Sequence, residues 1–398
     1  MTKRFSRRSI NRLAIALPGA ALVGSASAAW GQASYPNPFK MGAVLNLTGP
    51  TAGQGADFRA GLELAAQQWN AKGGIGGSKI EIVFEDHAAQ PAKAVTAAQK
   101  LIQVDGVKVL ANVYSSPVLA VVPIAQKEKV LQVSAGATSP RLVNISPYFM
   151  TSVANAALEV EVMLAFAKKK LGVSKIAILY GIDDFGAGVR DVTRALWTKM
   201  GGTVVADEGI DPAKADLAAV AAKIAAAKPD AIYVALAGVA IGTSVKQIRE
   251  AGFTGPLLGQ QGFEAPELFS VAGSAANNSY WTSAATTVAK DKEDAFVAAY
   301  KAAFNRDPTI YARTHYDLAM SLFEAMDNLR KQGKEWTAEN IRAALLGLGT
   351  TTGVLGPFSY REDGTALREL DIKTYKDGKG VVFLTAAQIQ AEGIFSFK

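Results

Sequence analysis

Short β-branched segments alternate with longer helical patterns along most of the chain. "MGAVLNL" (41–47) is typical of a buried strand, and "KIEIVFED" (79–86) of the next one. Between them, Leu62, Ala65 and Trp69 recur at the spacing of one helix face. Strands that alternate with helices predict parallel sheets covered by helices on both faces, with right-handed crossovers.

The alternation comes in two runs, which predicts two similarly built lobes. The first run ends near Thr151, and the second opens with a helical pattern at 156–171. The last third of the chain carries helical patterns with few strands, at 291–305, 311–331 and 337–346. A terminal hairpin is expected around the turn at Asp377-Gly378. The late helices must pack on lobes already formed, so we expect the chain to cross between lobes more than once.

Residues 1–33 have the features of a secretory signal peptide. A basic head precedes a short apolar run at 13–23, and small residues precede possible cleavage points after Ala28 and Ala33. The pair Arg7-Arg8 resembles a twin-arginine signal. The apolar run is too short to anchor the chain in a membrane, so we expect a soluble, periplasmic protein. The alternative is a basic tail on a cytosolic protein.

Composition excludes several classes of function. Cleavage at residue 33 removes five basic residues and lowers the formal charge from +7 to +2, which gives no electrostatic argument for nucleic acid. The chain has no cysteine and two histidines, and it contains neither G-x-S-x-G nor H-E-x-x-H. The glycines of "GQGADFRAG" lack the G-K-[ST] ending of a phosphate loop. We therefore expect no enzyme, no cofactor and no metal site.

The segments that follow the strands are the candidate binding loops, because ligands of open parallel sheets bind beyond the carboxyl ends of the strands. They are rich in Gly, Ser, Thr and Ala and expose backbone N–H groups at helix N-termini, which favours an anion. Ser115 and Ser116 stand where a strand gives way to a helix. From the residues alone, they are either caps of that helix or part of an anion site.

Several long segments resemble the leucine/isoleucine/valine-type periplasmic solute-binding proteins of ABC importers. The resemblance runs in the same order over nearly the whole mature chain, at 42–77, 79–101, 134–142, 175–191 and 256–276. It implies a type I periplasmic-binding fold, with two Rossmann-like lobes and a hinge of three crossings. The crossings are expected near 151–155, 281–285 and 348–356. The lobes would then comprise 34–151 plus 283–349, and 152–282 plus 350–398.

The resemblance also implies the site residues. In this family the first lobe holds the ligand's carboxylate, with a serine at the start of one helix and a threonine and its neighbours at the next. Here the first role falls to Ser115 or Ser116, and the second to Gly136, Ala137 and Thr138. This favours the carboxylate site over simple helix caps.

Four further positions match pocket residues of the family. An aromatic residue that closes over the ligand aligns with Phe185, and Tyr114 adds a second ring. Gln54 and Tyr311 lie where side chains shape the pocket in relatives. Arg313 and His315 fit a helix surface as well as a ligand contact, and His87 is expected on the lobe surface or in a loop.

One position departs from the family. Amino-acid-binding members place an acid in the second lobe, opposite the ligand's ammonium group, whereas "GQQGFE" places Gln261 there. A neutral amide cannot neutralise a buried cation. Asp183 or Glu264 could replace the acid, but their spacing does not place them in the cleft. The ligand is thus a hydrophobic or branched-chain amino acid, or an aromatic or aliphatic organic acid, and Gln261 favours the second class slightly.

The expected function is transport. A small carboxylate would dock on the first lobe, the second lobe would close over it, and a membrane permease would receive it from the monomeric protein. The alternative is an extracytoplasmic sensor that uses the same cleft to signal through a partner.

Overall fold

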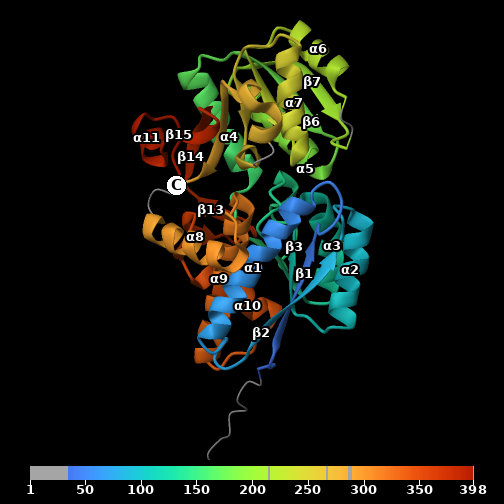
Figure 1. The fold of residues 1–398 in the computed structure, drawn as a ribbon, viewed down its shortest axis with the longest axis vertical. Coiled ribbons are helices and arrows are strands. Elements are labelled where there is room, and N and C mark those ends of the chain that lie inside the picture. Colours follow the sequence, from blue (N-terminus) through green and yellow to red (C-terminus); the bar gives the residue numbers. More distant parts are fainter. Residues whose placement is uncertain (1–34, 214–215, 266–267, 286–288, 398) are drawn as a thin grey trace, which may run out of the picture. The chain divides into compact units, whose positions relative to one another are not determined.

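Two separate sheets form the framework of the chain (Figure 1). The computed structural model describes residues 35–397, except 214–215, 266–267 and 286–288. The expected signal peptide and its cleavage points lie outside these residues. No helix in the described part is long and apolar enough to cross a membrane. The expected α/β fold with two parallel-rich sheets is confirmed.

The first sheet has five strands in the order β2-β1-β3-β4-β5, and all adjacent pairs are parallel. Its side chains alternate between two faces. Met41 and Ala43 of β1 face a core completed by α1, α9 and α10, whereas Val44 faces α2 and α3. We call this sheet and its helices the first lobe. Its elements are β1 (Phe39–Leu45), α1 (Ala52–Ala71), β2 (Ile80–Asp86), α2 (Pro91–Gln103), β3 (Val109–Asn112), α3 (Ser115–Lys127), β4 (Leu131–Ser134), β5 (Phe149–Thr151), α8 (Lys290–Phe304), α9 (Ile310–Lys331) and α10 (Ala338–Gly347).

The second sheet has seven strands in the order β15-β14-β10-β9-β8-β6-β7. Ile176 and Ile178 of β6 face α4, α5 and α11, whereas Ala177 and Leu179 face α6 and α7. The predicted hairpin is confirmed, because β14 and β15 pair antiparallel across the turn at 377–378. We call this sheet and its helices the second lobe. Its elements are α4 (Ala156–Lys170), β6 (Lys175–Gly181), α5 (Asp184–Lys199), β7 (Thr203–Ile210), α6 (Ala218–Ala226), β8 (Ala231–Ala235), α7 (Val239–Glu250), β9 (Leu257–Gly259), β10 (Ser279–Ala284), β14 (Leu370–Lys376), β15 (Lys379–Leu384) and α11 (Ala386–Ala391).

A small third sheet precedes the last passage between the lobes. It consists of β11 (Thr350–Gly353), β12 (Gly356–Tyr360) and β13 (Ala366–Arg368). Phe358 and Tyr360 of β12 point into the first-lobe core, and the Tyr360 hydroxyl lies 2.8 Å from Ser321 Oγ on α9. The chain therefore joins the second lobe between β13 and β14, and the boundary expected at residue 350 is wrong. The earlier passages lie between β5 and α4 and between β10 and α8.

Candidate functional site

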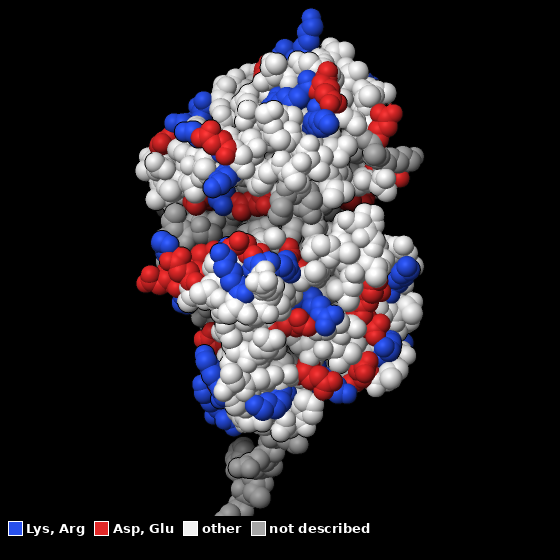
Figure 2. Space-filling model, viewed as in Figure 1, with Lys and Arg blue, Asp and Glu red and all other residues white. Residues whose placement is uncertain are grey.

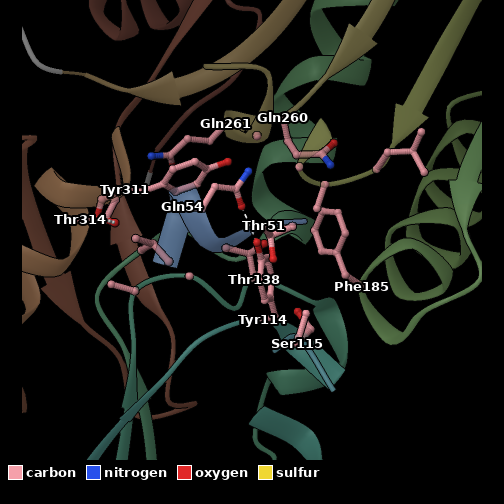
Figure 3. A pocket seen from close by; sticks show the side chains of 18 of the residues that line it. Thr51, Gln54, Tyr114, Ser115, Thr138, Phe185, Gln260, Gln261, Tyr311 and Thr314 are labelled. Atoms are coloured by element: carbon pink, nitrogen blue, oxygen red, sulfur yellow. Dashed lines mark hydrogen bonds between the residues drawn. The ribbon is translucent and has the colours of Figure 1, made fainter. Parts of the chain in front are cut away.

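A cavity of about 260 Å³ lies between loops of the two lobes (Figure 3). The loops that follow β1, β3 and β4 line it from the first lobe, and those that follow β6, β8 and β9 from the second. Its size suits one small molecule. Nine of the ten predicted residues line this cavity, namely Gln54, Tyr114, Ser115, Ser116, Gly136, Thr138, Phe185, Gln261 and Tyr311.

Ala137, the tenth predicted residue, is not among those that line the cavity. Its side chain is fully buried in an apolar cluster with Leu142 and Phe149. Its N–H donates to Ser134 Oγ at 3.1 Å, and the N–H of Gly136 donates to the same oxygen at 3.3 Å. The loop therefore turns around Ser134, which carries Ala137 away from the cavity.

The two predicted serines make different contacts. Helix α3 begins at Ser115, and its N-cap is Tyr114, whose φ is 61°. Ser115 Oγ accepts a hydrogen bond from Ser139 N at 3.2 Å, within the first lobe. Ser116 Oγ accepts one from Asp184 N at 3.2 Å, in the second lobe. These bonds go to other segments, so the serines do not act as caps of α3, and each hydroxyl retains its proton for donation.

Aromatic rings form the first-lobe wall of the cavity. The Tyr114 hydroxyl donates to Gln54 Oε1. The ring of Phe58 lies edge-on to the rings of Tyr114 and Tyr311, with centroids 6.2 Å and 5.2 Å apart. His315 packs behind Phe58, with its ring centroid 4.4 Å away. This wall suits an apolar ligand body.

The three uncertain side chains on the first lobe lie outside the cavity lining. Arg313 Nε donates to Glu293 at 2.7 Å, which fits the helix-surface alternative. His315 is fully buried, and burial lowers its pKa to about 3. His87 lies in the loop directly after β2, which is one of its two expected positions, and it is fully buried there rather than at the lobe surface. Its backbone N–H donates to Leu45 O at 2.8 Å, which extends the pairing of β2 with β1 by one hydrogen bond. Burial lowers the pKa of His87 to about 4.

Phe185 and Asp183 bring the start of α5 to the cavity. Asp183 is the N-cap of α5 and accepts a hydrogen bond from Gly186 N at 2.7 Å. Burial raises the pKa of Asp183. Glu264, the other acid considered, is not among the lining residues. It pairs with Lys373 and accepts a bond from Trp281 Nε1 at 3.4 Å.

Glu159 on α4 is a cavity residue that the sequence did not reveal. Its Oε1 accepts hydrogen bonds from Gln261 N at 3.0 Å and Thr282 Oγ1 at 3.3 Å. The side chain is buried, and burial raises its pKa to about 8. Glu159 is therefore mostly protonated at neutral pH. Gln260, next to the predicted Gln261, also lines the cavity.

The cavity carries no basic side chain among its described lining residues. A bound carboxylate would have to rest on neutral donors and helix N-termini. No group of His, Asp and Glu side chains that could hold a metal ion occurs in the described part of the chain. On the face drawn in Figure 2, acidic and basic side chains are interspersed between broad uncharged areas.

Comparison with known proteins agrees with this arrangement. The sequence pattern of the periplasmic binding protein family matches residues 38–379. The chain belongs to this family. Membership implies an extracytoplasmic location and fits the two-lobed fold.

Relatives within the family cover nearly the whole chain. The leucine-, isoleucine-, valine-, threonine- and alanine-binding protein of Pseudomonas aeruginosa is 27% identical over 88% of this chain and 94% of its own length. The branched-chain amino acid transporter substrate binding protein LivJ of Streptococcus pneumoniae, solved with isoleucine, is 25% identical with a TM-score of 0.78, over 87% of this chain and 100% of its own. An ABC transporter solute binding protein of Rhodopseudomonas palustris BisB5, solved with 3,4-dihydroxy benzoic acid, is 26% identical with a TM-score of 0.77. The match covers 87% of this chain and 96% of that protein. The chain is thus similar both to binding proteins for branched-chain amino acids and to one solved with an aromatic acid.

Proposed function

We propose that this periplasmic binding protein is the solute-binding component of an ABC importer, which captures a small carboxylate with an apolar body and delivers it to a membrane permease. The observation that carries the proposal is the cavity lined from both lobes, with aromatic rings on its first-lobe wall. Small-molecule sites combine such an apolar lining with a few placed polar groups.

The ligand's carboxylate would bind at the start of α3. Ser115 Oγ accepts from Ser139 N, so its own proton is left to donate to a carboxylate oxygen. Thr138 and Gly136 line the same side of the cavity. The N-terminal end of α3 adds the partial positive charge of the helix dipole.

The second lobe would close over the ligand by rotation about the hinge. Asp184 at the start of α5 contacts the first lobe three times. Ser139 Oγ donates to Asp184 O at 2.8 Å, Arg141 Nη1 lies 2.7 Å from Asp184 Oδ1, and Asp184 N donates to Ser116 Oγ. Ligand contacts with both lobes exist only in the closed form, so the ligand shifts the population toward it.

The relatives leave two ligand classes, because one was solved with isoleucine and another with 3,4-dihydroxy benzoic acid. We favour organic acids over amino acids. Gln261, to which the sequence resemblance gives the position of the family's acid, lines the cavity, and the pKa of Glu159 of about 8 keeps this side chain mostly protonated at neutral pH. An ammonium group buried against these two side chains would lack a counter-charge. Asp183, the other acid that lines the cavity, is already engaged as the N-cap of α5, where it accepts from Gly186 N.

A thermal-shift screen tests the proposal. The mature protein is unfolded and refolded to remove carried-over ligand, and is then heated with hydrophobic amino acids and with matched acids that lack the amino group. A ligand at about one hundred times its Kd stabilises the folded state by about 2.7 kcal/mol. Stabilisation by the plain acids supports the proposal, whereas stabilisation by amino acids alone assigns the other class. No stabilisation by any carboxylate would overturn it.

We also propose that residues 1–33 direct export by the twin-arginine route. The Arg7-Arg8 pair and the short apolar run support this. Replacing both arginines by lysine should leave the precursor in the cytoplasm, and normal export of that variant would contradict the route. N-terminal sequencing of the exported protein decides between cleavage after Ala28 and after Ala33.

A further inference from the structure

The second-lobe wall of the cavity carries three buried polar atoms without partners. They are Glu159 Oε2 and both side-chain atoms of Gln260, Oε1 and Nε2, none of which has a hydrogen-bond partner among the residues that the structure describes. Glu159 is 1% exposed and Gln260 is 2% exposed, and both line the cavity. They come from different elements, α4 and the loop after β9. Figure 3 shows Gln260 and Gln261 toward one side of the cavity and Ser115 and Tyr114 toward the other.

The contacts of Glu159 fix the chemistry of its free oxygen. Oε1 already accepts two hydrogen bonds, from Gln261 N–H and the Thr282 hydroxyl. No basic side chain lines the cavity among the described residues, and burial raises the pKa of Glu159 to about 8. The group is thus a carboxylic acid with Oε1 as its acceptor atom and Oε2–H as its donor.

The three atoms together suit one kind of ligand group. Glu159 Oε2–H and Gln260 Nε2–H can donate, and Gln260 Oε1 can accept. A hydroxyl group both accepts and donates, and a carbonyl oxygen accepts twice. A purely apolar ligand end would leave these buried atoms unpaired, which costs free energy. An ammonium group would require Glu159 to lose its proton.

We propose that Glu159 and Gln260 form a polar subsite that recognises an uncharged oxygen, a hydroxyl or a carbonyl, at the end of the ligand opposite its carboxylate. This inference rests on the proposed function, because it assumes that the first lobe holds the carboxylate. The ligand is then an organic acid with an oxygen function at the far end of its apolar body. Specificity arises because the analogue without this oxygen leaves the subsite unsatisfied.

Calorimetric titration of the refolded mature protein tests the subsite with matched pairs of acids. The pairs are benzoate and para-hydroxybenzoate, phenylpropionate and its para-hydroxy derivative, and hexanoate and its omega-hydroxy derivative. In at least one pair the hydroxylated acid should bind about tenfold more tightly or better. Equal or weaker binding of every hydroxylated acid would overturn the subsite.

Two substitutions at position 159 sharpen the test. Glu159→Gln keeps a neutral donor and acceptor and should preserve the preference for the hydroxylated acid. Glu159→Leu removes the polar group and should bring the two affinities of a pair together. Glu161→Gln, at an exposed position on the same helix, is the matched control and should change neither affinity. Thermal unfolding of each variant without ligand identifies any loss of fold.

The outcomes separate the two proposals. If the plain acids bind as tightly as the hydroxylated ones and Ser115→Ala weakens both, the subsite is wrong and the proposed function stands. If only amino acids bind and Glu159→Gln abolishes their binding, Glu159 serves as a counter-ion and the subsite is also wrong. If no carboxylate binds, both proposals fail.

Discussion

Asp317 and Arg368 form a buried ion pair, with Oδ2 and Nη2 3.2 Å apart across 51 residues of sequence. Asp317 also accepts hydrogen bonds from Val354 N at 2.7 Å and Leu355 N at 3.2 Å. Arg368 donates to Ser152 O at 2.8 Å, beside the first passage between the lobes. The pair therefore fixes α9 to the segments where the chain changes lobe.

Breaking this pair should strongly destabilise the protein. We expect Asp317→Ala to lower the free energy of unfolding by about 3–5 kcal/mol, because it leaves the Arg368 charge buried and uncompensated. Asp327→Ala is the control, since its partner Lys331 is exposed and such pairs contribute about 0–1 kcal/mol. Urea unfolding measures both variants. If both variants lose a similar free energy of unfolding, burial of the Asp317–Arg368 pair does not make its loss more costly than that of an exposed pair.

Ser115 and Thr138 should both contribute to ligand affinity, and only Ser115 should also contribute to stability, because its Oγ accepts the buried Ser139 N–H. Loss of a hydrogen bond to a charged carboxylate should weaken binding by about tenfold or more in Ser115→Ala and in Thr138→Ala. The melting temperature of the ligand-free protein should stay close to the wild-type value in Thr138→Ala and should fall in Ser115→Ala, which leaves the Ser139 N–H without its acceptor. Calorimetric titration gives the affinity, and exposed Thr254→Ala is the control. Unchanged affinity in both variants would remove the carboxylate assignment.

Ser116→Ala should act on closure of the lobes. Its hydroxyl accepts from Asp184 N across the cleft, and one neutral hydrogen bond contributes about 0.5–1.5 kcal/mol. We expect a more open average form without ligand, which small-angle X-ray scattering measures as a larger radius of gyration. Affinity should fall by less than in Ser115→Ala. An unchanged radius together with a loss of affinity as large as that of Ser115→Ala would instead indicate a direct ligand contact.

The two buried histidines should make the protein sensitive to acid. Burial lowers the pKa from 6.5 to about 4 for His87 and to about 3 for His315. The unfolded chain then binds protons that the folded chain does not, so this stability is complete above pH 6.5 and is lost as the pH falls toward the folded pKa. Each histidine should remove about 2 kcal/mol between pH 8 and pH 5. Urea unfolding at both pH values should show that His87→Gln and His315→Gln each change by about 2 kcal/mol relative to the wild type between pH 8 and pH 5, in the direction of less loss in acid. Comparison with the wild type removes the opposite contribution of Glu159, whose raised pKa stabilises the folded state as the pH falls below about 8. A variant that changes with pH as the wild type does would contradict the buried, neutral state.

The sequence predicted the fold well because its patterns are local. Alternation in β1 and the spacing of Leu62 and Ala65 on α1 reflect periods of two and of 3.6 residues, which need no knowledge of distant segments. The candidate loops followed from a general property of parallel sheets, namely that the carboxyl ends of their strands share one edge.

The second-lobe wall could not be predicted in the same way. Glu159 and Glu161 are two residues apart on α4, and nothing local distinguishes the buried acid from the exposed one. Glu159 is the buried one because it packs against Thr282 and the loop at Gln261, which come from distant parts of the sequence. Glu264 was a more obvious candidate in sequence, but Lys373, from a strand more than a hundred residues later, neutralises it. The burial of His87 in its loop was not foreseen, because the aromatic ring beside it, that of Tyr114 with its centroid 6.3 Å away, comes from another loop.

The position of α9 in the first-lobe core constrains how the chain is made. Leu318, Leu322 and Phe323 complete that core, but they are translated after β6 to β10 of the second lobe. The second sheet in turn needs β14 and β15, from the end of the chain. A nascent chain thus exposes part of one face of the first sheet until α9 is made, and an unfinished second sheet until translation is nearly complete. Such long-range closure slows folding. Truncation products that end before α9 should therefore be substrates for chaperones and proteases, and neither lobe can be expressed as one continuous fragment.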